Sequence, residues 1–595
     1  MSWQAWFTLI TCVTAVVILA RDRLPAALVV LGATVLVMLA GIITPEQALS
    51  GFANPAPVTV AALFVLARAV EKTGAIQPLI DRALGAERGE RASLFRLLAP
   101  AVGASAFLNN TPIVAMLAPQ VAEWAEKRGR SPSRYLMPIS YATILGGVVT
   151  VIGTSTNLVV SGLMQEHGLA PIGLFEITAV GLPVAVVGLL CLVVTAPTLL
   201  PERRSARRAL EEDVREFVMN TTVEPGGPLD GRTVEVAGLR NLQGVFLVQV
   251  TRGESGEERI APVAPTTTLR GGDQLTFAGR VDVVRDLEAM KGLRYAEGKH
   301  ALEYGDDGHT FFEAVVSATS TLVGKTLKEA DFRSRYQAAV LAIHRAGARV
   351  NEKLGNVKLR EGDTLLLLSD NGFAERWRDR SEFLLVAHLG GSRPVSTRKA
   401  WLVALVALGV VGLAGLGLLP ILHASLVGAF ALVLFRVLTP AEARDSVDLD
   451  VIVMIAAAFG LGAAIAASGL AGVIGSVIVD VFRGWGPVGV LFAVTVATIA
   501  LTELITNNAA AALLFPIAMA TTAQLGLNPR PYAIAVAVAA SMAFLTPIGY
   551  QTNTMVYGLG GYRFGDYARL GAPLTVIVVV GIVVFVPLFW PLTLP

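Results

Sequence analysis

The chain repeats one uncommon pattern of polar residues, each time inside an apolar stretch. The first copy contains Ser105, Asn109, Asn110 and Thr111, followed by Gly153, Thr154, Ser155, Thr156 and Asn157; the second contains Thr502, Glu503, Thr506, Asn507 and Asn508, followed by Gly549, Tyr550, Gln551, Thr552 and Asn553. Asn110 and Asn157 are 47 positions apart, and Asn507 and Asn553 are 46 positions apart. Polar groups in an apolar segment cost free energy unless they bind something. Two matched sets therefore indicate one binding site built from two halves.

The composition is typical of a membrane protein. Hydrophobic residues make up 54% of the 595 residues and charged residues 16%, and the mean hydropathy is +0.61. Soluble chains carry about 25% charged residues, and several apolar runs here approach the ~20 residues that cross a bilayer as a helix. The net charge of +2 gives no reason to expect a nucleic acid partner. We therefore expect a polytopic α-helical membrane protein in contact with lipid.

Composition divides the chain into four parts. Residues 1–200 and 398–595 are apolar and are predicted to form two transmembrane repeats, while residues 210–295 and 296–390 are predicted to form two small α/β domains between them. The predicted crossings lie near 4–20, 24–43, 56–71, 134–164 and 177–199, and near 400–418, 421–438, 450–467, 530–558 and 571–592. Re-entrant hairpins are expected near 92–125 and 487–523, with the paired asparagines at their tips. The fourth crossing of each repeat is expected to be broken at Gly153–Asn157 or Gly549–Asn553.

Crossing number and charge both predict the orientation. Five crossings and a hairpin that returns to its own side make the second repeat inverted relative to the first. Lys and Arg gather in the ranges 21–23, 82–96, 127–134 and 203–208, and are absent from 44–55 and 165–176. The second repeat has them at 398–399, 436–444 and 563–569, with Arg483 and Arg530 as exceptions. The positive-inside rule places the middle domains in the cytoplasm and both termini outside.

The middle of the chain is itself duplicated. Leu229-Asp-Gly-Arg-Thr233 matches Leu322-Val-Gly-Lys-Thr326, and the dipeptide Gly272-Asp273 matches Gly362-Asp363. Strand-like runs lie between the matching segments. Neither copy has the glycine-rich motif of a dinucleotide or phosphate site, so we expect no nucleotide there.

The repeated motif suits ions of both signs. A hairpin tip within the membrane leaves backbone groups unpaired, and its helix N-termini present N–H groups to anions. Carbonyls and the side-chain oxygens of Ser, Thr and Asn suit a hard cation such as Na⁺, and an Asn amide serves either ion. No Lys or Arg lies at a tip or a break. The alternative is that these residues only join packed helices, but the matched order and spacing of four motifs favours a site.

Glu503 has Ala106 as its counterpart in the first hairpin. A carboxylate within the membrane is a functional candidate by default. It would offset the charge of bound cations or carry a coupling proton. The alternative is a carboxylate that caps a helix or reaches the membrane interface.

At these residues the chain resembles the divalent anion/sodium symporter family, whose members carry a Ser-Asn-Thr motif at each hairpin tip. The middle domains resemble the paired TrkA-C (RCK C-terminal) domains that a subset of that family carries. The first tip has Asn109 where the family has Ser, and the second has Asn508 where it has Thr. Oxygen ligands are kept at both positions, but the anion preference is left open.

The resemblance implies two Na⁺ sites, an anion between the tips, a homodimer and an elevator-type movement. The first Na⁺ site would use Ser105, Asn109, Asn110 and Gly153, and the second Thr502, Thr506, Asn507 and Gly549. The anion would lie near Asn110, Thr111, Asn507 and Asn508, and we expect Thr154, Asn157 and Asn553 to contribute.

We therefore predict a secondary transporter of a bacterial-type inner (plasma) membrane rather than an enzyme. It would couple Na⁺ to the symport of a small divalent anion, with sulfate ranked first and a C4-dicarboxylate second. The middle domains would regulate transport or stabilise the dimer. The alternatives are a cation channel gated by these domains and an efflux carrier for an oxyanion. The chain has no Thr-Val-Gly-Tyr-Gly type filter, which counts against the channel.

Overall fold

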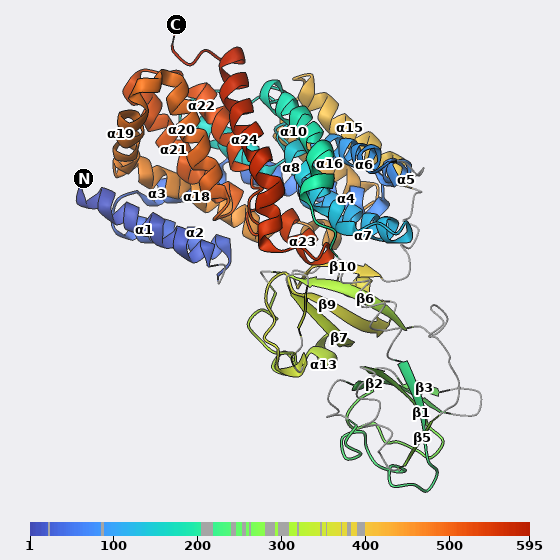
Figure 1. The fold of residues 1–595 in the computed structure, drawn as a ribbon. Coiled ribbons are helices and arrows are strands. Elements are labelled where there is room, and N and C mark those ends of the chain that lie inside the picture. The colour runs from blue at the N-terminus through green and yellow to red at the C-terminus, as the bar shows by residue number, and fades with distance from the viewer. Residues whose placement is uncertain are drawn as a thin grey trace. The chain divides into compact units, whose positions relative to one another are not determined.

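The computed structural model divides into a helical unit and a middle unit (Figure 1). The helical unit comprises residues 1–202, 394–557 and 562–595, and the middle unit comprises 203–393 and 558–561. The structure describes residues 1–21, 24–84, 89–203, 218–239, 245–252, 258–260, 263–279, 292–295, 309–317, 320–345, 348–350, 352, 354–370, 372–377, 382–388 and 399–594. The predicted boundaries at 210, 296, 390 and 398 lie outside these residues, as do Arg23, Arg88, Arg204, Arg207, Arg208 and Arg398 of the basic ranges.

The helical unit contains two series of helices in the same order. The first is α1 (Trp3–Ala20), α2 (Ala26–Leu39), α3 (Pro45–Ala53), α4 (Pro55–Thr73), α5 (Gln77–Leu84), α6 (Glu90–Ser105), α7 (Asn110–Lys127), α8 (Leu136–Gly147), α9 (Ser155–Glu166) and α10 (Thr178–Leu199). The second is α15 (Ala400–Gly415), α16 (Ile421–Leu434), α17 (Pro440–Asp445), α18 (Leu449–Ala467), α19 (Leu470–Phe482), α20 (Gly486–Thr502), α21 (Asn507–Leu525), α22 (Pro529–Ala540), α23 (Gln551–Leu559) and α24 (Phe564–Phe589). The predicted hairpins correspond to α6–α7 and α20–α21, and the predicted breaks separate α8 from α9 and α22 from α23.

Four helices were not predicted from the sequence: α3, α5, α17 and α19. The helices α3 and α17 are short, but the same local signal starts both. Thr44 and Gln47 form a capping box at α3, and Thr439 and Glu442 form one at α17, each with a proline in the first turn. The helices α5 and α19 follow Gly74 and Gly469, whose positive φ angles of 62° and 76° end the preceding helix. These matching signals extend the repeat along the whole of each series.

The two series pack against each other reciprocally. The helix α2 packs on α18, its counterpart α16 packs on α4, and α10 packs on its own counterpart α24. In Figure 1, α1 and α2 (blue) lie beside α18 (orange). Thr34 in α2 donates to the carbonyl of Ala457 in α18 at 2.9 Å. Because each series covers helices of the other, neither half has a complete core alone.

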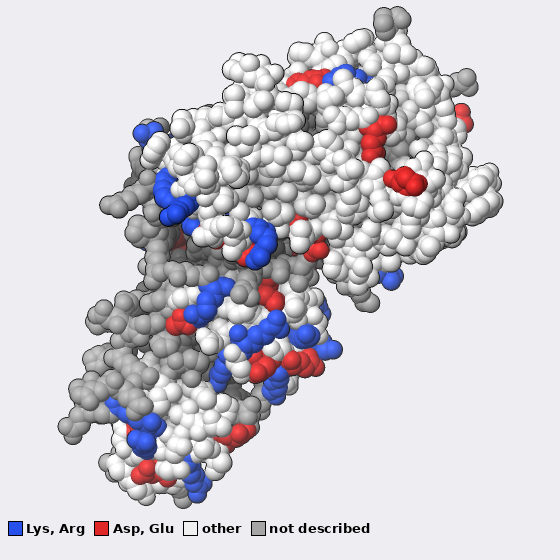
Figure 2. All heavy atoms as spheres, turned by 180° about the vertical axis from the view of Figure 1, so that it is seen from behind, with Lys and Arg blue, Asp and Glu red and all other residues white. Residues whose placement is uncertain are grey.

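The helical unit has the apolar character that the composition predicts. Among the described residues, six helical stretches are long and apolar enough to cross a membrane: 3–20, 45–73, 178–199, 449–467, 507–525 and 564–589. Five shorter helices, α2, α15, α16, α19 and α20, are also apolar. On the face seen in Figure 2, most of the surface of this unit carries no charged side chain.

The middle unit contains two five-stranded antiparallel sheets of one topology. The first has the order β3-β2-β4-β1-β5, with β1 (Val218–Val223), β2 (Val245–Arg252), β3 (Glu258–Ile260), β4 (Gln274–Gly279) and β5 (Leu293–Tyr295). The second has β8-β7-β9-β6-β10, with β6 (His309–Val316), β7 (Ala338–Arg345), β8 (Ala348–Arg349), β9 (Thr364–Asp370) and β10 (Phe383–His388). Renumbering turns one order into the other. In the described residues this unit has α13 (Phe332–Tyr336) and α14 (Phe373–Trp377) as its α-helices, so the α/β class of these domains stays a prediction.

Matching ion pairs also relate the two sheets. Arg252 pairs with Asp273 at 3.0 Å, and Arg345 pairs with Asp363 at 2.7 Å. Each aspartate also accepts a hydrogen bond from the backbone N–H three residues before it. The hydrogen bond to Asp363 raises the pKa of Arg345 above its usual value. The aspartate of the repeated Gly-Asp dipeptide therefore makes the same ion pair and turn contact in both sheets.

One exception to the positive-charge pattern is paired in the structure. Arg530, at the start of α22, binds Glu176 through two contacts of 2.6 and 2.7 Å and donates to the carbonyl of Ala170 at 3.0 Å. The side chains of Arg530 and Glu176 are 25% and 22% exposed. This bidentate pair joins the second helix series to the loop before α10.

The Arg530–Glu176 pair is expected to contribute measurably to stability. Glu176→Gln should lower the free energy of unfolding by about 1–3 kcal/mol, because it leaves a half-buried guanidinium without its charged acceptor. Adding Arg530→Gln to this variant should lower the free energy of unfolding only slightly further. Thermal unfolding of the purified single and double variants measures both effects. The control is Asp445→Asn, which breaks the exposed pair with Arg444 and should cost under ~0.5 kcal/mol. Equal effects of Glu176→Gln and Asp445→Asn would contradict this expectation.

Candidate functional site

The two hairpin tips are built alike. In the first, α6 ends at Ser105 and α7 begins at Asn110; in the second, α20 ends at Thr502 and α21 begins at Asn507. Ser105 Oγ donates to Oδ1 of Asn110 at 2.5 Å, and Thr502 Oγ1 donates to Oδ1 of Asn507 at 2.9 Å. In each tip a hydroxyl at the end of one helix therefore fixes the amide that starts the next helix.

The two breaks are also built alike. Asn157 Nδ2 donates to the carbonyls of Gly147 and Thr150 at 3.3 and 2.9 Å. Asn553 Nδ2 donates to the corresponding carbonyls of Ala543 and Thr546 at 3.0 and 3.2 Å. Both asparagines are fully buried. These side chains replace the backbone hydrogen bonds that are lost where the helix is interrupted.

Each break is fastened to the tip of its own half. The Thr150 hydroxyl donates to the backbone carbonyl of Ala106, and the Thr546 hydroxyl donates to the backbone carbonyl of Glu503 at 3.3 Å. Ala106 and Glu503 follow directly on the last residues of α6 and α20. Tip and break therefore form one assembly, and the helical unit contains two of them.

Each tip also contacts the break of the other half. Thr111 Oγ1 donates to Oε1 of Gln551 at 3.2 Å, and Asn508 Nδ2 donates to the hydroxyl of Ser155 at 3.1 Å. Asn110 Nδ2 donates to the hydroxyl of Tyr550 at 2.6 Å, and this hydroxyl also lies close to Thr154 and Asn507. The two assemblies therefore converge on one polar region, with the Tyr550 hydroxyl between the tips.

The helix ends at this region suit an anion. The helices α7, α9 and α21 all begin here, and their N-caps Asn109, Thr154 and Thr506 make no side-chain capping hydrogen bond. The N–H groups of their first turns are thus available, and the helix dipoles add positive potential. Backbone N–H groups and neutral amides can bind an oxyanion without a basic side chain.

The breaks suit a small hard cation. Asn157 Oδ1 and Glu503 Oε2 are buried oxygen atoms without a hydrogen-bond donor in the described part of the chain. A Cβ built on Gly153 would lie 2.5 Å from the carbonyl oxygen of Gly147 and 2.7 Å from that of Ser105, so only glycine allows these oxygens to approach. Oxygen atoms without donors are what Na⁺ requires, and the residues present fit a cation at each break.

The structure brings most of the predicted residues together. Ser105, Asn110, Thr111, Gly153, Thr154 and Asn157 lie at the tip and break of the first half, and Thr502, Glu503, Asn507, Asn508, Gly549 and Asn553 at those of the second. Thr506 is an exposed N-cap. The side-chain N–H groups of Asn157 and Asn553 donate to carbonyls of their own breaks, and Asn553 Oδ1 also accepts from Ser140 in α8. These contacts indicate a supporting position for the two residues.

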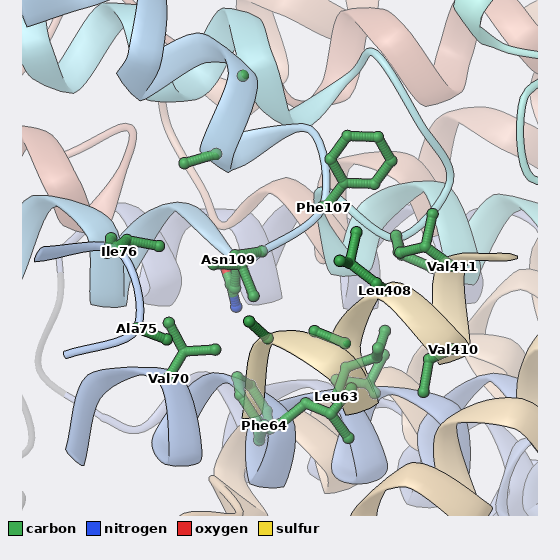
Figure 3. A pocket seen from close by; sticks show the side chains of 18 of the residues that line it. Leu63, Phe64, Val70, Ala75, Ile76, Phe107, Asn109, Leu408, Val410 and Val411 are labelled. Carbon is green, nitrogen blue, oxygen red and sulfur yellow. The ribbon is translucent and has the colours of Figure 1, made fainter. Parts of the chain in front are cut away.

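The Asn109 side chain lies apart from these contacts. It lines a cavity of about 420 Å³ between α4, the first tip and α15, together with residues such as Phe64, Phe107 and Leu408. Figure 3 shows Asn109 surrounded by the apolar side chains of this cavity. Such a lining is unsuited to a small anion. The polar region between the tips, and not this cavity, is therefore the candidate site.

Sequence reasoning missed four residues of the site: Ser155, Thr156, Tyr550 and Gln551. All four lie in the break motifs, so the repeat itself was the signal that could have identified them. Their partners Asn508, Asn110 and Thr111 belong to the other half. Contacts between halves depend on the packing of the two helix series, which residue spacing does not reveal.

Comparison with known proteins identifies the family of this chain. The model of a family described as citrate transporter matches residues 15–529. The chain belongs to the citrate transporter family. It is therefore a multi-pass membrane transporter rather than an enzyme, in agreement with the likeness of its tips to the divalent anion/sodium symporters.

Relatives that cover nearly the whole chain include several transporters. An uncharacterized transporter of Synechocystis sp. is 36% identical over 97% of this chain and 95% of its own length. A Chlamydomonas reinhardtii protein, provisionally named as a sulfur deprivation response regulator, is 35% identical over 93% of this chain and 96% of its own length. Sodium/sulfate cotransporter 2 of the same alga is 26% identical over 89% of this chain and 83% of its own length.

The breaks of this transporter are expected to depend on their asparagines. Asn157→Ala should lower the free energy of unfolding by about 1–3 kcal/mol, because two buried carbonyls lose their donor. Asn553→Ala should lower the free energy of unfolding by more than Asn157→Ala does, because Asn553 Oδ1 also accepts a hydrogen bond from Ser140 at 2.7 Å. Thermal unfolding measures both, with Gln165→Ala on the exposed face of α9 as the control. No loss of stability in Asn157→Ala would show that the amide does not hold the break.

Proposed function

We propose that this transporter carries a small divalent anion together with Na⁺, with sulfate as the first candidate and a C4-dicarboxylate as the second. The observation that carries the proposal is the contact of each tip with the break of the other half. In this arrangement helix N-termini would surround one anion position, with an oxygen-rich break on each side of it. The names of relatives that are sodium/sulfate cotransporters also support this choice.

The anion would bind to neutral donors. Its oxygens would accept from Asn110, Thr111, Asn507 and Asn508, from Thr154 and Ser155, and from first-turn N–H groups of α7, α9 and α21. The side chains that face each other across the site are already 2.6–3.2 Å apart. An anion would enter by taking the place of these hydrogen-bond partners.

Na⁺ would travel with the anion at two sites. The first would take oxygens of Ser105, Asn109, Asn110 and Gly153, with Asn109 contributing its backbone carbonyl because its side chain lines the apolar cavity. The second would take oxygens of Thr502, Thr506, Asn507 and Gly549. Since Asn110 and Asn507 belong both to a cation site and to the anion site, binding of one ion orients the amide for the other. This shared use of two amides is a direct physical basis for coupling.

The two helix series would form inverted repeats with re-entrant hairpins, and an elevator-type movement would expose the site alternately to the two sides. The matching helix order and reciprocal packing support this view. The middle domains would lie in the cytoplasm and both chain ends outside, in a bacterial-type inner membrane.

The middle unit would contain two TrkA-C-like domains. Their common sheet order and matching Arg–Asp pairs support a duplicated module. We propose that they regulate transport or stabilise a homodimer.

Binding of anion and Na⁺ should be interdependent. With 100 mM NaCl, sulfate should raise the melting temperature of the purified protein, whereas with choline chloride at equal ionic strength it should not, because the folded state then lacks the cations that complete the anion site. Succinate, citrate and phosphate complete the panel. Stabilisation by citrate but not by sulfate would replace sulfate with citrate as the proposed substrate. Stabilisation by sulfate without Na⁺ would contradict the coupling.

Tyr550 is expected to bind the anion through its hydroxyl proton. That oxygen already accepts from Asn110, so its own O–H can be donated to an anion. Tyr550→Phe should raise the KM for sulfate about 10–100-fold, the value of one hydrogen bond to a charged group, with little change in the Na⁺ dependence. Uptake into proteoliposomes measures this, and the control is Tyr557→Phe in α23, the helix that begins directly after Tyr550. An unchanged KM would exclude Tyr550 from the anion site.

A further inference from the structure

The apolar cavity beside the first hairpin tip is separate from the polar region between the tips. Its volume is about 420 Å³, and its walls come from α4, the first tip, the first break and α15. Figure 3 shows Phe64 of α4, Phe107 of the tip and Leu408 of α15 around one space. Protein interiors leave few voids larger than a water molecule, and a cavity of this size is typical of a small-molecule pocket.

The lining of the cavity suits an uncharged and mostly apolar molecule. None of the described residues that line it is charged, and most of them are Val, Leu, Ile, Ala or Phe. A charged group would lose its hydration there and would find no partner of opposite charge. An apolar chain, in contrast, would make dispersion contacts with all of the walls.

The Asn109 amide gives the cavity one polar point. Asn109 is the N-cap residue of α7, but its side chain makes no capping hydrogen bond, and it bonds to none of the residues that the structure describes. In Figure 3 the nitrogen atom of this amide is directed into the space between the labelled side chains. An amide among apolar walls costs free energy unless it has a partner. A ligand with a hydroxyl or an amide group would supply that partner.

The cavity opens at the surface beside α15. Leu408 of α15 is 70% exposed and Phe107 of the tip is 39% exposed, although both line the cavity. Trp401 and Leu405 of α15 are exposed as well. In a membrane protein such an apolar surface faces lipid chains. A lipid can therefore enter the cavity sideways from the membrane.

The volume of the cavity sets the length of the chain that it holds. An apolar cavity of ~150 Å³ binds one benzene molecule, so about 420 Å³ corresponds by proportion to a chain of about sixteen carbon atoms. This is the chain length of a common membrane lipid, and one such chain fills the space.

We propose that this cavity binds an uncharged single-chain lipid. Its chain lies against α4 and α15, and its hydroxyl or amide head group forms a hydrogen bond with Asn109. Ser155 lines the cavity and also bonds with Asn508 across the candidate site. A bound lipid therefore holds the first tip and break in the arrangement described above and slows transport. The effect on transport rests on the proposed function, whereas the binding itself does not.

Photolabelling of the full-length protein in phosphatidylcholine nanodiscs tests the binding. The probe is 1-hexadecanol with a diazirine in its chain, and mass spectrometry identifies the labelled residues. Label is expected on α4, on α15 and on residues 103–109. An excess of 1-hexadecanol should remove this label, whereas hexadecyl phosphate, which has the same chain and a charged head group, should leave most of it.

Two results of the labelling would overturn the proposal. Label on other segments alone would show that phospholipid chains or a second copy of the protein cover the opening. Equal competition by hexadecyl phosphate and by 1-hexadecanol would show that the head group is not selected as uncharged.

A variant that fills the cavity gives a second test. Ala407→Trp places a large side chain in the space from α15 and should reduce the label on residues 103–109 about tenfold. The control is Leu405→Trp, on the exposed surface of the same helix and not among the lining residues, which should keep the label. Equal labelling of the two variants would overturn the proposal. If Ala407→Trp does not fold, the competition experiment on the wild-type protein still decides it.

Sulfate counterflow in proteoliposomes separates this proposal from the proposed function. 1-Hexadecanol should slow counterflow by the wild-type protein but not by Ala407→Trp, which excludes a general effect of the alcohol on the bilayer. If no anion is exchanged at all, the anion symport proposal fails, whereas photolabelling still decides whether the cavity binds lipid. If 1-hexadecanol slows both proteins equally, the effect through the cavity is wrong.

Discussion

Each hairpin tip of this transporter ends against the broken helix of the other half, and the rest of the site depends on that contact. Asn110 reaches Tyr550, Thr111 reaches Gln551, and Asn508 reaches Ser155. A tip with unpaired backbone groups is costly within a membrane unless other protein covers it. Here the tip of one half covers the break of the other, so the requirement that backbone groups be satisfied also brings the two halves of the site together.

The sequence predicted much of the fold because the constraints of a membrane are strong and local. Long apolar runs predict helices, and a polar interruption such as Asn109-Asn110 predicts a turn or a break. The short helices α3 and α17 were not predicted, because nine and six residues are too few to show a periodic pattern. Their capping boxes were nevertheless visible in the sequence. The strand-like runs and the repeated Gly-Asp positions of the middle unit indicated strands but not their order, because strand order depends on long-range pairing.

The site could be predicted as a set of residues but not as a set of contacts. Repetition identified Ser105, Asn110, Thr502 and Asn507, whose hydrogen bonds are within one tip. It did not identify Tyr550 as the group between the tips, because that position follows from how two distant segments pack. Nor did it distinguish Asn110, which faces the site, from Asn109, which lines an apolar cavity. Neighbouring residues at a helix start point in different directions, and only the fold decides which of them faces the ligand.

The central claim is that the two halves form one site where Na⁺ and a divalent anion bind together. Counterflow in proteoliposomes tests it most directly: vesicles filled with unlabelled sulfate are diluted into a trace of labelled sulfate, with either Na⁺ or choline on both sides. We expect accumulation of label with Na⁺, none with choline, and strong competition by unlabelled sulfate. Equal accumulation with choline would contradict the coupling, and no exchange of sulfate, succinate or citrate under either condition would contradict the anion site itself.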